Sequence, residues 1–242
     1  MLAGTVRGLH RWPVKSLRGE DVSAARLDDR GMAGDRAHAL VDGRRGRDGK
    51  VRTVRQDSGM LGWSAAYGDV PDPVGPPELR GPDGTTWTWG DPELAEALTT
   101  SLGGPLDLRA APGQQDRGPT VLVTFQASLD GLGEELGAEV DLRRFRTNLH
   151  LEADLPAFAE QRWEPGVRLA VGEVELAVTG EHSGPCVRCA VPSWDAAGRE
   201  RWRGLQQHLI GAHDNLFGVI MRVTRAGDVR VGDEAGEPSA RV

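Results

Sequence analysis

Short segments in which apolar and polar residues alternate recur along the chain, and this period of two is typical of β-strands. Turn formers separate the segments, since the chain has 33 glycines and 15 prolines. Many short strands joined by tight turns are therefore expected. Residues 43–50 are expected to form a charged hairpin tip, residues 226–228 a second hairpin turn, and residues 70–82 a surface loop or strand edge. We expect strands over residues 5–9, 20–27, 35–42, 120–125, 149–151, 167–170, 174–179, 216–225 and 229–231.

Apolar residues recur at helical spacing in three places. The leucines of residues 94–102 follow Asp91 and Pro92, a pair typical of a helix start, because aspartate caps a helix and proline is tolerated at its first position. Residues 127–137 and 199–213 carry apolar residues at the same spacing. The pattern as a whole predicts a mainly β fold with a few short helices.

The length of 242 residues suits one large domain or two small ones. A polar, turn-like segment begins at residue 113 and indicates a boundary there. We expect an N-terminal region over residues 1–112, a C-terminal domain over residues 113–236 and a frayed tail over residues 237–242. Fraying is expected to begin as early as Glu234.

The charge and the composition narrow the function classes. A net charge of −7 argues against nucleic acid as the main partner, because phosphate binding needs a surplus of lysine and arginine. No apolar run approaches the roughly 18 residues that a membrane-spanning helix needs. The N-terminus lacks the pattern of a signal peptide, and two cysteines make no disulfide framework. We therefore expect a cytoplasmic protein.

The two cysteines lie close together, as Cys186-Val187-Arg188-Cys189, and this pair has four interpretations. It could belong to a zinc site with His182, although such a site needs four ligands. It could be a thioredoxin-like redox pair, although Pro192 disfavours the helix that should follow. Both cysteines could be buried as small apolar residues. Finally, one thiolate could ligate a redox metal within a bound cofactor.

Four basic residues support the fourth interpretation, because each lies at a predicted junction of loop and strand: Lys15, Arg36, Arg146 and Arg188. Sites are commonly built at such junctions. Arginine forks and a lysine charge together suit a phosphorylated, anionic cofactor. Ser128 stands at a predicted helix start, where it can cap the helix and also contact an anion.

Six motifs in one order resemble the MOSC family with its N-terminal β-barrel region, which includes the mitochondrial amidoxime reducing component and bacterial counterparts. The resemblance covers residues 6–233. Its motifs are Trp12-Pro13-Val14-Lys15-Ser16, Gly31-x-x-Gly34-Asp35-Arg36, Phe145-Arg146-Thr147-Asn148, Ala159-Glu160-x-x-Trp163, Cys186-x-Arg188-Cys189, and Leu216-Phe217-Gly218 through Val231-Gly232-Asp233.

The resemblance implies an N-terminal β-barrel-like region, a C-terminal MOSC-type β-barrel and a molybdenum cofactor between them. Cys189 would be the metal ligand and the catalytic residue, with Cys186 beside it and Arg188 holding the thiolate in place. No role for pyridoxal phosphate is implied. The residues that the resemblance assigns to cofactor binding are Lys15, Ser16, Arg36, Ser128, Arg146, Asn148 and Arg188.

The implied activity is a molybdenum-dependent oxidoreductase that reduces N-hydroxylated or N-oxide small molecules. No cysteine follows Cys189, so electrons would come from a separate flavin, ferredoxin or cytochrome protein. The alternative is a carrier of the cofactor, or of sulfur as a Cys189 persulfide. The chain departs from the family at Thr147, where proline is frequent and where we expect a looser loop. It also departs at Phe125-Gln126, where a threonine and an aspartate are usual, and at Val187.

Overall fold

The centre of the fold is a closed β-barrel. The computed structural model describes residues 2–47, 49–111 and 118–238, and over these residues seven strands complete the ring. β11 and β12 run parallel, and the other neighbours in the ring are antiparallel. The mainly β fold with short helices is thus confirmed. The ring runs β11 (Val121–Phe125), β12 (Leu149–Ala153), β1 (Ala3–Arg11), β18 (Glu234–Gly236), β13 (Arg168–Val171), β14 (Val174–Ala177) and β16 (Leu216–Arg225), which pairs again with β11.

Apolar side chains from every strand of the ring fill the barrel. On β1 the buried residues Val6 and Leu9 are three positions apart, which simple alternation would place on opposite faces. A register shift between Val6 and Gly8 resolves this, because the extra residue of a β-bulge reverses the alternation. Two further strands extend the sheet, β2 (Glu20–Val22) beside β1 and β15 (Gly184–Val187) beside β16.

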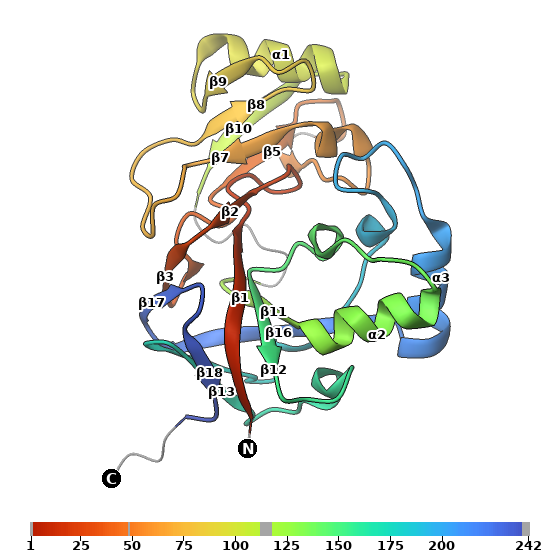
Figure 1. Ribbon diagram of the computed structural model, residues 1–242. Coiled ribbons are helices and arrows are strands. Elements are labelled where there is room, and N and C mark those ends of the chain that lie inside the picture. The colour runs from red at the N-terminus through yellow and green to blue at the C-terminus, as the bar shows by residue number, and fades with distance from the viewer. Residues whose placement is uncertain (1, 48, 112–117, 239–242) are drawn as a thin grey trace.

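Two small sheets and one helix form a second layer, which lies above the barrel in Figure 1. Leu40 and Leu79 from the sheets and Trp63, directly before β7, pack against Leu94 and Leu98 of the helix and give this layer its own core. One sheet holds β5 (His38–Asp42), β6 (Lys50–Val51) and β10 (Leu106–Ala110), the other holds β7 (Ser64–Ala66), β8 (Glu78–Arg80) and β9 (Thr86–Thr88), and the helix is α1 (Pro92–Leu102).

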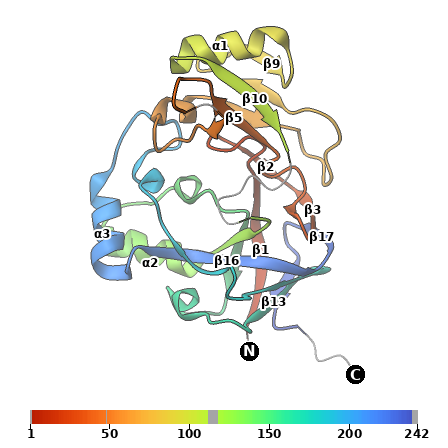
Figure 2. The same cartoon turned by 180° about the vertical axis from the view of Figure 1, so that it is seen from behind.

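Helices α2 (Gln126–Leu136) and α3 (Arg203–His213) lie together at one flank of the barrel in both views (Figures 1 and 2). Leu132 of α2 and Leu205 and Leu209 of α3 share a core with Phe145 and Phe217. All three predicted α-helices are therefore present, and α3 begins at Arg203 rather than at residue 199. Short 3₁₀ turns are η1 (Ser58–Gly62), η2 (Leu142–Phe145), η3 (Ala159–Arg162) and η4 (Val191–Ser193).

The sequence pattern was wrong where tertiary pairing breaks a run of strand-forming residues. The strand expected over residues 20–27 divides at Ser23, whose backbone N–H donates to Asp69, so that β2 and β3 (Ala24–Asp28) enter different sheets. The strand expected from residue 35 begins at His38, after a turn. β17 (Gly227–Arg230) pairs with β3 and not with β16, so the second predicted hairpin does not form; β4 (Gly31–Met32) completes this sheet.

The other predictions have mixed outcomes. β5 and β6 pair as the first hairpin requires, although its residue 48 lies outside the described residues. The expected surface loop over residues 70–82 contains β8. Glu234 is not frayed, because β18 pairs with β1 and β13, while residues 239–242 and the predicted boundary at residues 112 and 113 lie outside the described part. In the described residues, no helix combines the length and the apolar character needed to cross a membrane.

Gly218 of β16 gives a test of barrel closure. Its φ of 72° is left-handed, and an added Cβ would lie 2.8 Å from the carbonyl oxygen of Val123 on the neighbouring strand. Gly218→Ala should therefore lower the free energy of unfolding by about 2 kcal/mol or more in urea denaturation. Gly211 of α3 has open space around it, so Gly211→Ala should stabilise by about 0.5–1 kcal/mol. Equal effects of the two substitutions would contradict this account.

Candidate functional site

A cavity of about 250 Å³ lies beside the barrel, and we call it the basic cavity. Segments far apart in the sequence line it: the loop after β1, the turn before β5, the start of β12 and the stretch around β15. The structure brings to its wall six of the seven predicted cofactor-binding residues and the predicted metal ligand: Lys15, Ser16, Arg36, Arg146, Asn148, Arg188 and Cys189.

Three of these residues have a left-handed backbone, with φ of 73° at Ser16, 46° at Arg36 and 55° at Arg146. Residues other than glycine rarely adopt this conformation, which costs on the order of 1 kcal/mol or more each. Such strain concentrates at ligand sites, where the surrounding structure enforces it. The concentration of strained residues in one wall is therefore what a preorganised binding site requires.

Arg36 is held by a hydrogen-bond network that joins the two layers of the protein. Its Nη1 atom forms an ion pair with the buried carboxylate of Asp35 and donates to Oδ1 of Asn148 over 3.2 Å. Its Nη2 atom donates to the carbonyl oxygen of Arg146 over 3.2 Å. Asp35 also accepts the backbone N–H of Trp12. Arg36 is thus fixed in place and partly neutralised.

Arg146 is a cation with unused hydrogen-bonding capacity. Its guanidinium lies 4.3 Å from the centre of the Trp12 ring, and Nη1 donates to the carbonyl oxygen of Leu17 over 2.8 Å. Its buried Nη2 atom has no hydrogen-bond partner among the described residues. Burial, and to a lesser degree the charge of Arg36, lower the pKa of Arg146 to about 9, so the side chain is still protonated at neutral pH. An anion in the basic cavity would satisfy both the charge and the free N–H.

Arg188 contacts the first cysteine of the pair rather than the second. Its Nη1 atom lies 3.1 Å from Sγ of Cys186, and its Nη2 atom donates to the carbonyl oxygen of Phe145 over 2.6 Å. The expected contact that holds the Cys189 thiolate is not among these hydrogen bonds. Asn215 exchanges two hydrogen bonds with the backbone of Arg188, which fixes this segment from the side of α3. The Nε atom of Arg188 is buried without a partner among the described residues.

Cys189 is partly buried at the cavity wall, where it packs against Val54, Leu61 and Val191, and neither cysteine is in a disulfide. A single 3₁₀ turn follows the pair instead of the α-helix that a thioredoxin-like site places there. Within the described residues, neither cysteine belongs to a group of three potential metal ligands, so His182 does not complete a zinc site. Cys189 therefore presents one thiol to the basic cavity.

Ser128 does not line the basic cavity. Helix α2 begins earlier than expected, with Phe125 as its N-cap residue, so Ser128 lies in the first turn and is buried. Its hydroxyl donates to Glu160 over 2.8 Å and accepts the backbone N–H of Phe158 over 2.8 Å. Burial raises the pKa of Glu160. Through these two hydrogen bonds Ser128 joins α2 to η3.

Two departures from the family pattern are hydrogen-bonded within the fold. Thr147 is buried, and its hydroxyl lies within hydrogen-bonding distance of the carbonyl oxygens of Leu122 and Leu149, so the expected loosening of this loop is not seen. Gln126 lies outside the basic cavity and accepts from Nε2 of His150 over 2.9 Å. The third departure, Val187, is exposed at the cavity wall.

The sequence analysis missed the segment Thr53-Val54-Arg55, which lines the basic cavity from the loop after β6. No motif marks these residues, because their position at the cavity depends on how the second layer packs on the barrel. Thr120, at the start of β11, was missed for the same reason.

A closed barrel with a basic, thiol-bearing cavity beside it defines the class of protein that the structure shows. The family model described as MOSC domain matches residues 113–235, and the model described as MOSC N-terminal beta barrel domain matches residues 3–70. The chain belongs to the MOSC family, and the predicted resemblance is confirmed. No curated protein matches the sequence.

Two solved structures are similar. The YUAD protein from Bacillus subtilis, in a crystal structure, aligns with 97% of this chain and 96% of its own at 12% identity and a TM-score of 0.50. YiiM from Geobacillus stearothermophilus aligns with 55% of this chain and 67% of its own at 15% identity and a TM-score of 0.36. At 12% identity the similarity to the YUAD protein concerns the fold alone. The TM-score of YiiM is too low to support a comparison.

The basic cavity should bind a simple anion even without a cofactor. Saturating inorganic phosphate should raise the Tm of cofactor-free protein by about 5 °C or more, since a ligand that binds only the native state stabilises it. Arg146→Gln should reduce this rise to below about 1 °C. Arg143→Gln is the matched control, because Arg143 is 61% exposed and does not line the cavity. A full phosphate response in Arg146→Gln would contradict the anion site.

His150 should make the fold sensitive to acid. Burial, and secondarily His10, lower the pKa of His150 to about 4, against about 6.5 in the unfolded chain. Between these values the unfolded chain binds more protons than the native protein, so stability is fully present above pH 6.5 and is lost as the pH falls toward 4. The loss should reach about 3 kcal/mol in urea denaturation across this range. His150→Gln should flatten the slope, whereas exposed His182→Gln should keep it.

Proposed function

We propose that this protein binds a molybdenum cofactor in the basic cavity and is an oxidoreductase for N-hydroxylated or N-oxide small molecules, with electrons from a separate donor protein. One observation carries the proposal: five basic side chains and two thiols, from segments as far apart as Lys15 and Cys189, line the same cavity. A thiolate suits molybdenum as a soft ligand, and the basic side chains suit a phosphorylated pterin.

The polar atoms of the cavity fit such a group. Nη2 of Arg146 and Nε of Arg188 are buried and have no partner in the part of the chain that the structure describes, which is costly for charged groups unless a ligand satisfies them. Lys15, Arg36, Arg55, Arg146 and Arg188 line the cavity, and among the described residues no acidic residue lines it. The residual positive charge favours an anionic ligand over a neutral one.

Each of these cavity residues would have its own role in binding the cofactor. Arg146 and Lys15 would bind the phosphate, the first as a planar fork and the second as a point charge. Arg36, held by Asn148, would orient the pterin, with Ser16 beside it. Cys189 would hold the metal as a thiolate. We leave Ser128 out of this set because its hydroxyl is committed to Glu160.

When bound, the cofactor supplies two-electron removal of oxygen from the substrate. The chain binds it, fixes its orientation and surrounds it with positive charge, as proteins do for cofactors that carry the difficult step. Val187 and Ile220 give the wall an apolar side against which an uncharged substrate could lie.

The rival function, a sulfur carrier, uses the same thiol. The partial exposure of Cys189 allows it to carry a persulfide and pass it to another protein. The two functions differ in whether molybdenum is retained, and this decides the experiment.

The test measures molybdenum and pterin in protein from a host that makes the cofactor. The wild type should contain molybdenum near one equivalent and should reduce an amidoxime with a chemical reductant. Cys189→Ser should lose at least about 90% of the molybdenum and the activity, because the thiolate is the metal ligand. Arg146→Gln should lose the pterin as well, since the anion site is lost, whereas Arg143→Gln should behave as wild type.

Two outcomes would overturn the oxidoreductase. Wild-type protein without molybdenum but with a persulfide on Cys189 would favour the carrier. Molybdenum content unchanged in Cys189→Ser would remove the assigned ligand.

A further inference from the structure

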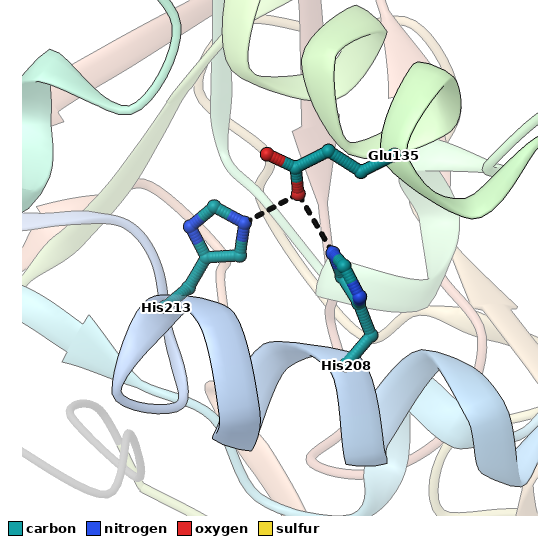
Figure 3. A group of neighbouring side chains, drawn as sticks. All are labelled: Glu135, His208 and His213. Carbon is teal, nitrogen blue, oxygen red and sulfur yellow. Dashed lines mark hydrogen bonds and ion pairs between the residues drawn. The ribbon is translucent and has the colours of Figure 1, made fainter.

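Glu135, His208 and His213 form a cluster between α2 and α3, and none of the three lines the basic cavity (Figure 3). Glu135 extends from α2, whereas His208 and His213 extend from α3. Both imidazoles direct Nε2 at one carboxylate oxygen, Oε2 of Glu135, over 2.7 Å from His208 and 2.6 Å from His213. The three side chains thus converge on one point.

Phe158 and Gln161, which are not part of the cluster, hold His213 in place. The ring of Phe158 lies against His213 with 4.0 Å between ring centres, and Nδ1 of His213 lies 3.4 Å from the amide nitrogen of Gln161. The side chain of His213 is 8% exposed, that of His208 27% and that of Glu135 38%. One imidazole is therefore fixed by packing, while the other two groups have freedom to adjust and solvent reaches the point of convergence.

We propose that this cluster is a binding site for a divalent transition-metal ion of the zinc class, which clamps α2 to α3. Two imidazole nitrogens and one carboxylate oxygen are a donor set that zinc uses, with a further position left for water. To bind the ion, each imidazole must present the lone pair of Nε2, so its ring proton moves from Nε2 to Nδ1.

The distances need only a small change. Around zinc at about 2.0–2.1 Å from each ligand, tetrahedral ligand atoms lie about 3.3 Å apart. Each nitrogen–oxygen pair must therefore open by about 0.6 Å, which rotation of the partly exposed Glu135 and His208 can supply. The amide of Gln161 must turn or withdraw, and its 3.4 Å contact with His213 is too long to resist this strongly.

The site would stabilise a helix that also supports the basic cavity. Asn215 follows directly after α3, accepts from Gln206 of that helix and hydrogen-bonds the backbone of Arg188. A metal ion at His208 and His213 would hold the C-terminal half of α3 and, through it, the segment that carries both cysteines.

Zinc titration by calorimetry, with purified full-length protein, tests the site. We expect one equivalent of Zn²⁺ to bind the wild type and to raise its Tm by about 5–10 °C at a 100-fold excess over Kd. His208→Asn removes a ligand at a partly exposed position. It should weaken zinc binding at least about tenfold, because even the loss of a residue that only orients a metal ligand costs about that much. Glu135→Gln should weaken it similarly.

Two controls separate this site from the cysteines and from surface binding. Cys189→Ser should keep the wild-type affinity, and exposed His182→Asn should keep it too. Co²⁺ bound in place of Zn²⁺ should give visible ligand-field bands without the near-ultraviolet charge transfer of a thiolate. Wild-type protein that binds no Zn²⁺, unchanged affinity in His208→Asn, or a thiolate band with Co²⁺ would each overturn the proposal.

Discussion

The side chain of Asn148 makes the hydrogen bonds on which both the barrel and the basic cavity depend. It accepts the N–H of Leu122 from β11 and donates to the carbonyl oxygen of His10 from β1. It also accepts from Arg36, which stands just before β5 of the second layer. Buried amides that use donors and acceptors in this way specify one arrangement, because each unmade bond would leave a costly polar atom in the interior. The same side chain therefore sets the spacing of two strands and the position of a cavity cation.

The cavity stores unfavourable energy in the absence of a ligand. Three residues with left-handed backbones and the buried nitrogens of two arginines are all concentrated in one wall. A core selected for stability would exclude such features, whereas a site shaped for an anion needs them ready before the ligand arrives. An anion that bound there would gain affinity, because the site would need little reorganisation on binding.

Local patterns predicted the helices and most strands, because a 3.6-residue or two-residue period is written directly into the sequence. The cavity residues were found because short motifs carry Lys15, Arg36, Arg146 and Arg188. Pairings between distant segments were not predictable: nothing local at Ser23 shows that Asp69 will divide its strand, and Ser128 was misplaced because α2 begins at Gln126. The cluster of Glu135 with two histidines had no motif, since 73 residues separate Glu135 from His208.

The position of β18 between β1 and β13 has a consequence for biosynthesis. β1 comprises residues 3–11, but its neighbour β18 is completed only with residues 234–236. The ring thus stays open, with one edge of β1 unpaired, until residue 236 has left the ribosome. Such long-range closure is slow and leaves the nascent chain prone to aggregation in the meantime. The basic cavity is completed almost as late as the ring, because its lining residues extend from Lys15 to Ile220.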